Sequence, residues 1–204
     1  EPQWGGLPHA QIEDAEVREL PGGYELWLSC ISRGIAVLAV EDPALGTIYC
    51  SGDGSGPACP CGNQSPSGSQ SGCLHSGGGG ATLRANGTGS VAADDLLLAA
   101  ADMPLNKNGL VFFGANPTSG APFSSGLLCI ASPVRRLAMQ NSGLGGSFTY
   151  GPGLVAYAAS QYAPPFHFTA GGTWSFQAWF RDFQGGCPGK DTNTSNALTL
   201  QFLP

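Results

Sequence analysis

The chain has 204 residues, of which only 11% are charged, against roughly a quarter in an average soluble domain. Its 32 glycines and 16 prolines argue against a helical bundle or coiled coil, whereas 42% apolar residues suffice for a core. With eight basic residues, a net charge of −6 and no run of about 18 apolar residues, we expect neither a nucleic-acid partner nor a membrane span.

The net charge is concentrated at the N-terminus. Residues 1–42 contain eight acidic and two basic side chains, whereas residues 43–204 contain six of each. Such a run is often a solvated surface, but it also fits an arm whose partner is another molecule. Because the sequence begins at Glu1 without a signal-type apolar segment, we expect a processed, secreted protein.

The N-terminal arm is predicted to contain a β-hairpin. Residues 24–31 alternate in polarity, with one face made of Tyr24, Leu26, Leu28 and Cys30. Residues 35–40 are apolar on both faces, which is typical of a covered central strand or of a strand docked in a groove. Residues 11–20 fit a short helix only loosely. We take 1–47 as an acidic arm and 48–204 as the main domain.

Short apolar segments then recur between turns. The expected strands are 48–50, 82–85, 96–100, 109–114, 127–130, 135–139, 147–150, 154–159, 173–182 and 197–203. Segment 173–182 alternates most clearly, with one face made of Trp174, Phe176, Ala178 and Phe180. About ten strands with short connections predict an all-β fold, an antiparallel β-sandwich or jelly-roll-like domain with a Cys/Gly-rich loop at 51–80 and an N-terminal β extension.

Six of the seven cysteines are predicted to form disulfides. The stretch 51–80 has too few apolar residues to be ordered by burial, and cross-links supply what burial cannot. Cys59 and Cys61 are too close in sequence to pair with each other, so we expect two bridges among Cys50, Cys59, Cys61 and Cys73. Cys129 and Cys187 then form the third bridge, and Cys30 is expected to be a buried free thiol.

Zinc is the alternative for the cysteine cluster. Cys59, Cys61, Cys73 and His75 offer four ligands, but their spacing does not match a zinc knuckle. Calcium is the other metal considered, because Asp53 and the pair Asp94 and Asp95 lie in polar loops, yet they lack the alternating acids of a calcium loop. We therefore predict no metal and no cofactor.

Several segments together resemble a recurrent domain of secreted planctomycete-type bacterial proteins. Residues 49–63 read Tyr-Cys-Ser-Gly-Asp-Gly-Ser-Gly-Pro-Ala-Cys-Pro-Cys-Gly-Asn, and residues 174–182 read Trp-Ser-Phe-Gln-Ala-Trp-Phe-Arg-Asp. The segments 109–114, 126–129 and 195–202 also agree. The resemblance covers about 48–204 and implies a secreted β domain. It brings no established catalytic or ligand-binding residue, and 1–47 lies outside it.

The sequence contains no motif of a known catalytic centre. The three histidines, His9, His75 and His167, have no acidic neighbour at motif spacing, and neither a zinc-protease motif nor a nucleophile elbow is present. We therefore predict that the protein is not an enzyme.

Two functions of different classes remain. The first is a structural subunit of an extracellular filament or surface assembly, a homopolymer held by its N-terminal strand region. Its candidate assembly strand consists of Ile35, Ala36, Val37, Leu38, Ala39 and Val40. The alternative is a carbohydrate-binding or adhesive module that uses Trp179 as a stacking platform, with glycans as partners.

Overall fold

The computed structural model describes residues 12–20, 23–30, 34–41, 45–183 and 187–204. In the first three of these ranges, side chains are described for 14–18, 25–29 and 35–38. The chain divides into two compact units, Glu1–Ala44 and Leu45–Pro204. The second unit begins at Leu45 because this residue packs against the main core and its N–H donates to the carbonyl of Ala85.

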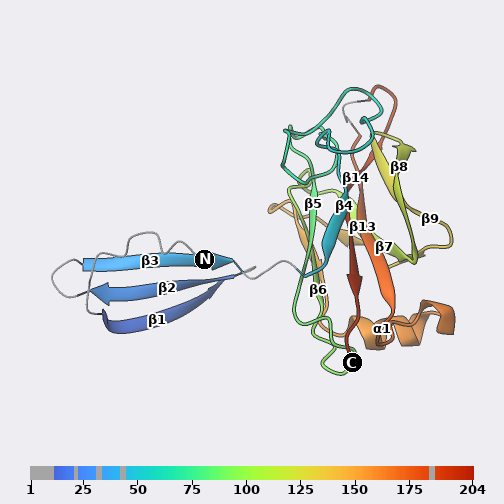
Figure 1. Cartoon of the computed structure of the whole chain (residues 1–204). Helices are drawn as coiled ribbons and strands as arrows, with labels where there is room; N and C mark the ends of the chain where they lie inside the picture. Colours follow the sequence, from blue (N-terminus) through green and yellow to red (C-terminus); the bar gives the residue numbers. More distant parts are fainter. Residues whose placement is uncertain (1–11, 21–22, 31–33, 42–44, 184–186) are drawn as a thin grey trace. The chain divides into compact units, whose positions relative to one another are not determined.

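The first unit is a three-stranded antiparallel meander, which we call the N-terminal sheet (Figure 1). Its strands are β1 (Ile12–Leu20), β2 (Gly23–Cys30) and β3 (Gly34–Glu41), in the order β1-β2-β3. The two strands predicted from 24–31 and 35–40 are confirmed. The short helix that 11–20 fits only loosely is not formed over 12–20, because Ala15 and Val17 alternate with charged neighbours at a period of two and pair with β2.

The second unit is built around an antiparallel central sheet in the order β10-β7-β13-β14-β4, with β11 also paired to β7. The strands of this sheet are β4 (Thr47–Cys50), β7 (Asn108–Gly114), β10 (Arg135–Arg136), β11 (Gln140–Asn141), β13 (Thr173–Arg181) and β14 (Thr192–Gln201). Most residues of the three inner strands are buried, since both faces of the sheet are covered.

One face of the central sheet packs against a second sheet and the short helix α1 (Figure 1). The second sheet has the order β12-β6-β5, with strands β5 (Thr82–Asn86), β6 (Leu97–Ala101) and β12 (Phe148–Tyr150). Between them lies the main core, whose largest fully buried side chains include Phe113, Phe176, Phe180 and Phe202. The alternation predicted for 173–182 is confirmed, because the face with Trp174 and Phe176 points into this core.

The opposite face is covered by the hairpin of β8 (Asn116–Phe123) and β9 (Gly126–Ala131). Leu110 and Phe112 of β7 pack there against Ile130 of β9. The sequence analysis missed β8, because its two prolines and one glycine are typical of a turn. In the structure its pairing with β9 shifts between Pro117 and Ala121, so the prolines lie in an irregular hairpin strand.

The strand predicted at 154–159 is wrong, because this segment is the helix α1 (Leu154–Gln161), followed by a 3-10 turn at Pro164–Phe166. Leu154 and Ala158, four residues apart, are its buried residues. Asp94 caps the helix from a distant loop, since its carboxylate accepts the N–H groups of Val155 (2.7 Å) and Ala156 (3.0 Å). This remote cap satisfies helix N–H groups that no neighbouring residue reaches.

A buried polar run on β14 connects the layers. Residues 192–196 read Thr-Asn-Thr-Ser-Asn and are all less than 8% exposed. The Asn196 side chain accepts the N–H of Leu83 (2.7 Å) and donates to the Leu83 carbonyl (3.0 Å), so it pairs with β5 as a neighbouring strand would. Thr194 does the same for β9, accepting the N–H of Leu127 (3.1 Å) and donating to its carbonyl (2.8 Å).

Gln177, on β13, completes these cross-layer contacts. Its fully buried amide donates to the carbonyls of Leu127 (2.8 Å) and Ser195 (2.9 Å) and accepts the N–H of Cys129 (3.0 Å). The backbone of β9 therefore pairs with side chains of the central sheet. Such close approach requires glycine at Gly126, where a Cβ atom would collide with Thr194 and Asn193.

We expect Gln177→Met to lower the free energy of unfolding by about 2–4 kcal/mol. The substitution nearly keeps the volume but removes the Gln177 partner of the buried Cys129 N–H and Ser195 carbonyl, and it leaves the Leu127 carbonyl with the Thr194 hydroxyl alone. Urea unfolding checks this value. The matched control is Gln201→Met, which removes one exposed hydrogen bond and should cost less than about 1 kcal/mol. Equal effects of the two variants would contradict the role given to Gln177.

Candidate binding surfaces

All six cysteines predicted to form disulfides do so in the structure. The bridges are Cys50–Cys129, Cys59–Cys73 and Cys61–Cys187. Of the two bridges predicted within the cluster, only Cys59–Cys73 is present, because Cys50 and Cys61 pair outside it, and the predicted bridge Cys129–Cys187 is wrong. The fold explains this difference, because β9 packs beside β4 and β14 and brings Cys129 to Cys50. Cys61 is thus left to pair with Cys187, whereas the side chain of Cys30 lies outside the described residues.

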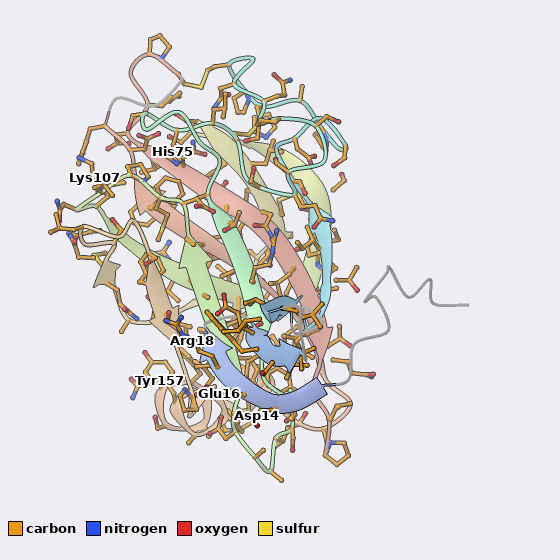
Figure 2. All side chains as sticks on the ribbon, turned by 90° about the vertical axis from the view of Figure 1, so that its left-hand side faces the viewer. Asp14, Glu16, Arg18, His75, Lys107 and Tyr157 are labelled. Carbon is orange, nitrogen blue, oxygen red and sulfur yellow. A yellow bond between two sulfur atoms is a disulfide. The ribbon has the colours of Figure 1, made fainter. Side chains whose placement is uncertain are left out.

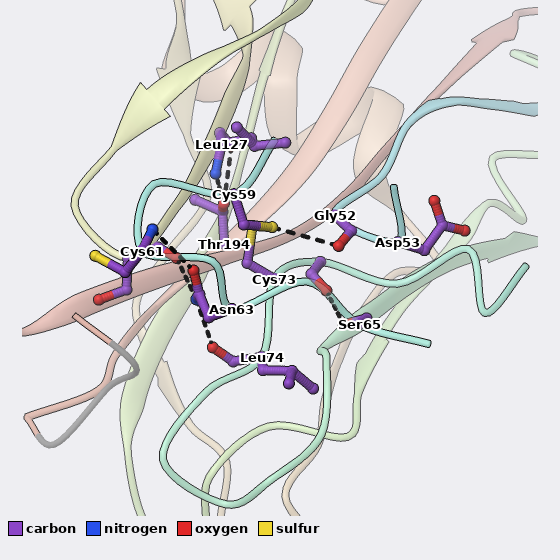
Figure 3. Close-up of a disulfide and its surroundings, with 12 residues drawn as sticks. Gly52, Asp53, Cys59, Cys61, Asn63, Ser65, Cys73, Leu74, Leu127 and Thr194 are labelled. Carbon is purple, nitrogen blue, oxygen red and sulfur yellow. Dashed lines mark hydrogen bonds between the residues drawn. A yellow bond between two sulfur atoms is a disulfide. The ribbon is translucent and has the colours of Figure 1, made fainter. Parts of the chain in front are cut away.

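The Cys/Gly-rich loop is ordered by the bridges together with hydrogen bonds between its own turns (Figure 3). The amide of Asn63 donates to the carbonyls of Leu74 (2.8 Å) and Ser125 (2.9 Å). Gly72 passes so close to β14 that a Cβ atom would collide with the carbonyl of Thr194. Since Cys59, Cys61 and Cys73 are all oxidised, none of them is available as a zinc thiolate.

Peptide mapping without reduction should recover the three bridges as the structure pairs them. Replacing Cys59 and Cys73 by alanine releases a loop of 14 residues and should cost about 3 kcal/mol of unfolding free energy, with the other two bridges retained. Recovery of a peptide joining Cys129 to Cys187 would contradict the pairing.

Asp53 holds the start of the same loop. Its carboxylate accepts the hydroxyl of Ser55 (2.5 Å) and the N–H groups of Ser55 (3.1 Å) and Gln70 (3.0 Å). The hydroxyl of Ser55 is the main cause that lowers the pKa of Asp53, and the N–H donors add to it. Asp53 therefore closes a turn. Among the described residues, no three histidine, cysteine or acidic side chains gather as a metal site.

We expect acid to remove the stabilisation that Asp53 provides. A lowered folded-state pKa means that this stabilisation is complete above the unfolded value, near 4, and is lost as the pH falls through the lower folded value. The difference in unfolding free energy between the parent and Asp53→Asn should therefore shrink between pH 5 and pH 2, as urea unfolding can measure. Ser55→Ala should weaken this pH dependence. A difference in unfolding free energy that stays constant from pH 5 to pH 2 would refute the stabilising role of the Asp53 carboxylate.

The described histidines are held by backbone groups. His75 is buried, with Nε2 lying 2.6 Å from the carbonyl oxygen of Asp102 and Nδ1 accepting the N–H of Gly77. His167 Nε2 lies 2.9 Å from the carbonyl oxygen of Tyr162. Both imidazoles thus act as local braces of the loops in which they lie.

An apolar groove with a volume of about 460 Å³ opens on the hairpin side of the central sheet. Three of its eleven lining residues are polar or charged, namely Ser132, Arg136 and Thr192. The other eight are Leu110, Phe112, Phe123, Leu128, Ile130, Val134, Met139 and Trp179. The sequence did not indicate this groove, because its walls come from six strands and from the loops on either side of β10. Trp179 was the one lining residue that the sequence had indicated as a candidate for binding. The structure places it, half-buried, in the wall of the groove.

Basic side chains border this groove. Arg136 lines it and is exposed, and Arg181 lies 5.4 Å from the Trp179 ring. Arg181 also approaches Phe183, whose exposed ring lies 5.5 Å from Lys107 Nζ. Asp191 pairs with Arg181 at 2.7 Å, but no described carboxylate lies within ion-pair distance of Arg136 or Lys107. The groove therefore combines apolar walls with nearby basic side chains, of which Arg181 is paired with Asp191, whereas Arg136 and Lys107 have no ion-pair partner among the described residues.

The predicted assembly strand, 35–40, lies in β3, at one edge of the N-terminal sheet. Ile35 is 68% exposed, Val37 46% and Leu38 38%. Ala36 is half-buried, whereas the side chains of Ala39 and Val40 lie outside the described residues. β3 thus presents apolar groups to solvent on both of its faces.

One face of the N-terminal sheet is both acidic and apolar, and we call it the acidic face. The pairing of the strands brings Asp14, Glu16 and Arg18 of β1 into line with Glu25 and Trp27 of β2 and with Ile35 and Val37 of β3. Figure 2 labels Asp14, Glu16 and Arg18 of β1. Arg18 pairs with Glu25 at 3.8 Å, and Glu25 also accepts the indole N–H of Trp27. The opposite face is apolar, formed by residues such as Ala15, Val17, Leu26 and Leu38.

The sequence contains three Asn-x-Ser/Thr motifs for N-glycosylation, at Asn63, Asn86 and Asn193. In two of them the asparagine side chain is used in hydrogen bonds within the fold. Asn63 and Asn193 are buried, and their amide nitrogens donate to backbone carbonyls. Asn86, at the end of β5, is half-exposed. A glycan on the folded chain would therefore be attached at Asn86 rather than at the other two sites.

Three bridges fit an oxidising compartment outside the cytoplasm. Within the described part of the chain, no helix has the length and apolar character needed to cross a bilayer. Comparison with protein-family models, curated proteins and solved structures finds no match to this chain.

Proposed function

We propose that the protein is a non-enzymatic structural subunit of an extracellular filament or surface assembly, and that copies are joined through the N-terminal sheet. The observation that carries this proposal is the edge strand β3, with exposed apolar side chains on both faces. A strand of this kind exposes unpaired backbone groups and apolar surface together, which favours association with another chain.

The two edges of the N-terminal sheet differ in the way that the proposal requires. β1 carries Asp14, Glu16 and Arg18, and charges on an edge strand hinder pairing with another chain. The described side chains of β3 carry no charge. Only one edge is therefore left open to a partner, which suits a directional contact between identical subunits.

The second unit has the properties of a durable structural module. Its three layers are cross-linked by three disulfides and by the buried side chains of Gln177, Thr194 and Asn196. Each of its six acidic residues already has a structural partner. Asp53, Asp94, Asp95 and Asp182 accept backbone N–H groups, Asp102 accepts the hydroxyl of Thr82, and Asp191 pairs with Arg181. These contacts favour a structural role over acid–base catalysis.

A carbohydrate-binding role is the weaker candidate. It is favoured by Trp179, which lines a groove of suitable size. However, eight of the eleven lining residues are apolar, whereas recognition of a sugar needs several directed polar groups. The groove therefore suits apolar side chains better than hydroxyl groups.

We expect the purified full chain to form filaments or large oligomers, seen by negative-stain microscopy and by sedimentation at increasing protein concentration. Ile35→Lys combined with Val37→Lys should abolish assembly, because both exposed side chains would place charge on the open edge strand. The variant should keep its far-UV circular dichroism and its three disulfides.

The control is Leu144→Lys, which places the same charge on an exposed apolar residue of the second unit, 83% exposed. It should assemble like the parent. A parent chain that stays monomeric at high concentration, or an Ile35/Val37 variant that still assembles, would refute the proposed function.

A further inference from the structure

We infer that the groove beside Trp179 is the receiving site for the acidic face of the N-terminal sheet of a second copy. This inference rests on the proposed function and deepens it, because it names the two surfaces that meet. The contact is heterologous, so it repeats from copy to copy and does not close into a dimer.

The groove offers apolar walls that a partner can cover. Met139 is 59% exposed and Phe123 38%, although both line the groove, and Trp179, which also lines it, lies 5.4 Å from the Arg181 guanidinium. Its volume of about 460 Å³ accommodates several aliphatic side chains. Apolar groups of this size that remain accessible to water in a disulfide-bonded domain indicate a contact surface.

The acidic face of the N-terminal sheet has the complementary composition. Ile35 and Val37 are its exposed aliphatic residues, and Trp27 lies opposite Val37 on the neighbouring strand. Asp14 and Glu16 extend the same face on β1, and neither forms an ion pair with another described residue. Among the side chains described on the opposite face of this sheet none is charged, although the strand register also places Glu19 on that face.

The distribution of charge favours the acidic face of the N-terminal sheet over its opposite face, and it favours a second copy of the chain as the partner of the groove. Residues 1–42 carry the whole net charge of −6, whereas Arg136 lines the groove, Arg181 lies beside its Trp179, and Lys107 lies next to Phe183, which Arg181 also approaches. Opposite potentials steer the two surfaces together, and like potentials oppose contacts of sheet with sheet or of groove with groove. A second copy supplies both apolar side chains and acidic groups, as this groove requires.

The decisive experiment uses two full-length variants. Met139→Glu places a negative charge in the groove, and Ile35→Lys places a positive charge on the acidic face. Each alone should raise the critical concentration for assembly at least tenfold, because a buried aliphatic contact is replaced by a mismatched charge. Mixed in equal amounts, they should form at least a one-to-one heterodimer, since one variant keeps an intact sheet and the other an intact groove. The two substituted surfaces carry opposite charges and do not repel each other, so larger alternating complexes equally support the inference. Sedimentation velocity measures this complex.

Matched controls are Leu144→Glu, an exposed apolar residue outside the groove, and Val17→Lys, on the opposite face of the N-terminal sheet. Both should assemble like the parent. Assembly of the parent should also weaken as salt rises from 50 to 500 mM, because part of the attraction is between exposed charges.

The outcomes separate this inference from the proposed function. If Ile35→Lys blocks assembly but Met139→Glu does not, the N-terminal sheet assembles by another surface and the groove is not its site. If the two variants fail to form a heterodimer, the sheet and the groove are not complementary, and the inference is equally refuted. If the parent is a monomer, for example because the sheet occupies the groove of its own chain, both proposals fail.

Discussion

The second unit depends on polar side chains, two amides and one hydroxyl, that replace backbone partners in its interior. A layer of β-strands normally needs a neighbouring strand for its N–H and C=O groups, and burial without such a partner costs several kcal/mol. Gln177, Thr194 and Asn196 provide that pairing from the central sheet to β9 and β5. The two outer layers can therefore approach the sheet face-on at the distance of a hydrogen bond. The glycine at position 126 and the position of Cys129 beside Cys50 both follow from this close approach.

The same interaction explains what the sequence could and could not predict. Apolar alternation identified β13, β2 and the C-terminal half of β14, residues 197–201, because burial of one face requires that pattern. The N-terminal half of β14, residues 192–196, was not predicted as a strand, because a polar run normally indicates a loop. Its side chains are buried only because segments far away in sequence supply carbonyl and N–H groups. The helix α1 was taken for a strand for a related reason, since its cap, Asp94, is about 60 residues away in the chain.

The two candidate surfaces differ in the same way, because one depends on local sequence and the other on contacts between distant segments. The open strand β3 could be predicted, because its apolar character on both faces is a local property of 35–40. The groove could not be predicted, since its walls come from β7, β8, β9, β10, β13, β14 and the loops beside β10, which only the folded topology brings together. Two of the three disulfide pairings could not be predicted for the same reason. Elimination among nearby cysteines is a local argument, whereas Cys50–Cys129 and Cys61–Cys187 join residues 79 and 126 positions apart.

The bridge between Cys50 and Cys129 has a mechanical consequence for an assembly of the proposed kind. Tension between neighbouring subunits would enter the second unit at β4, the strand that directly follows the N-terminal sheet in the chain. Four residues into that strand, Cys50 transfers the load through a covalent bond to β9, and β9 forms one wall of the groove that would hold the next copy. The strain would thus pass from subunit to subunit without crossing the aromatic core. Stretching such a fibre would load covalent bonds and the two docking surfaces, while the sandwich itself stays unloaded.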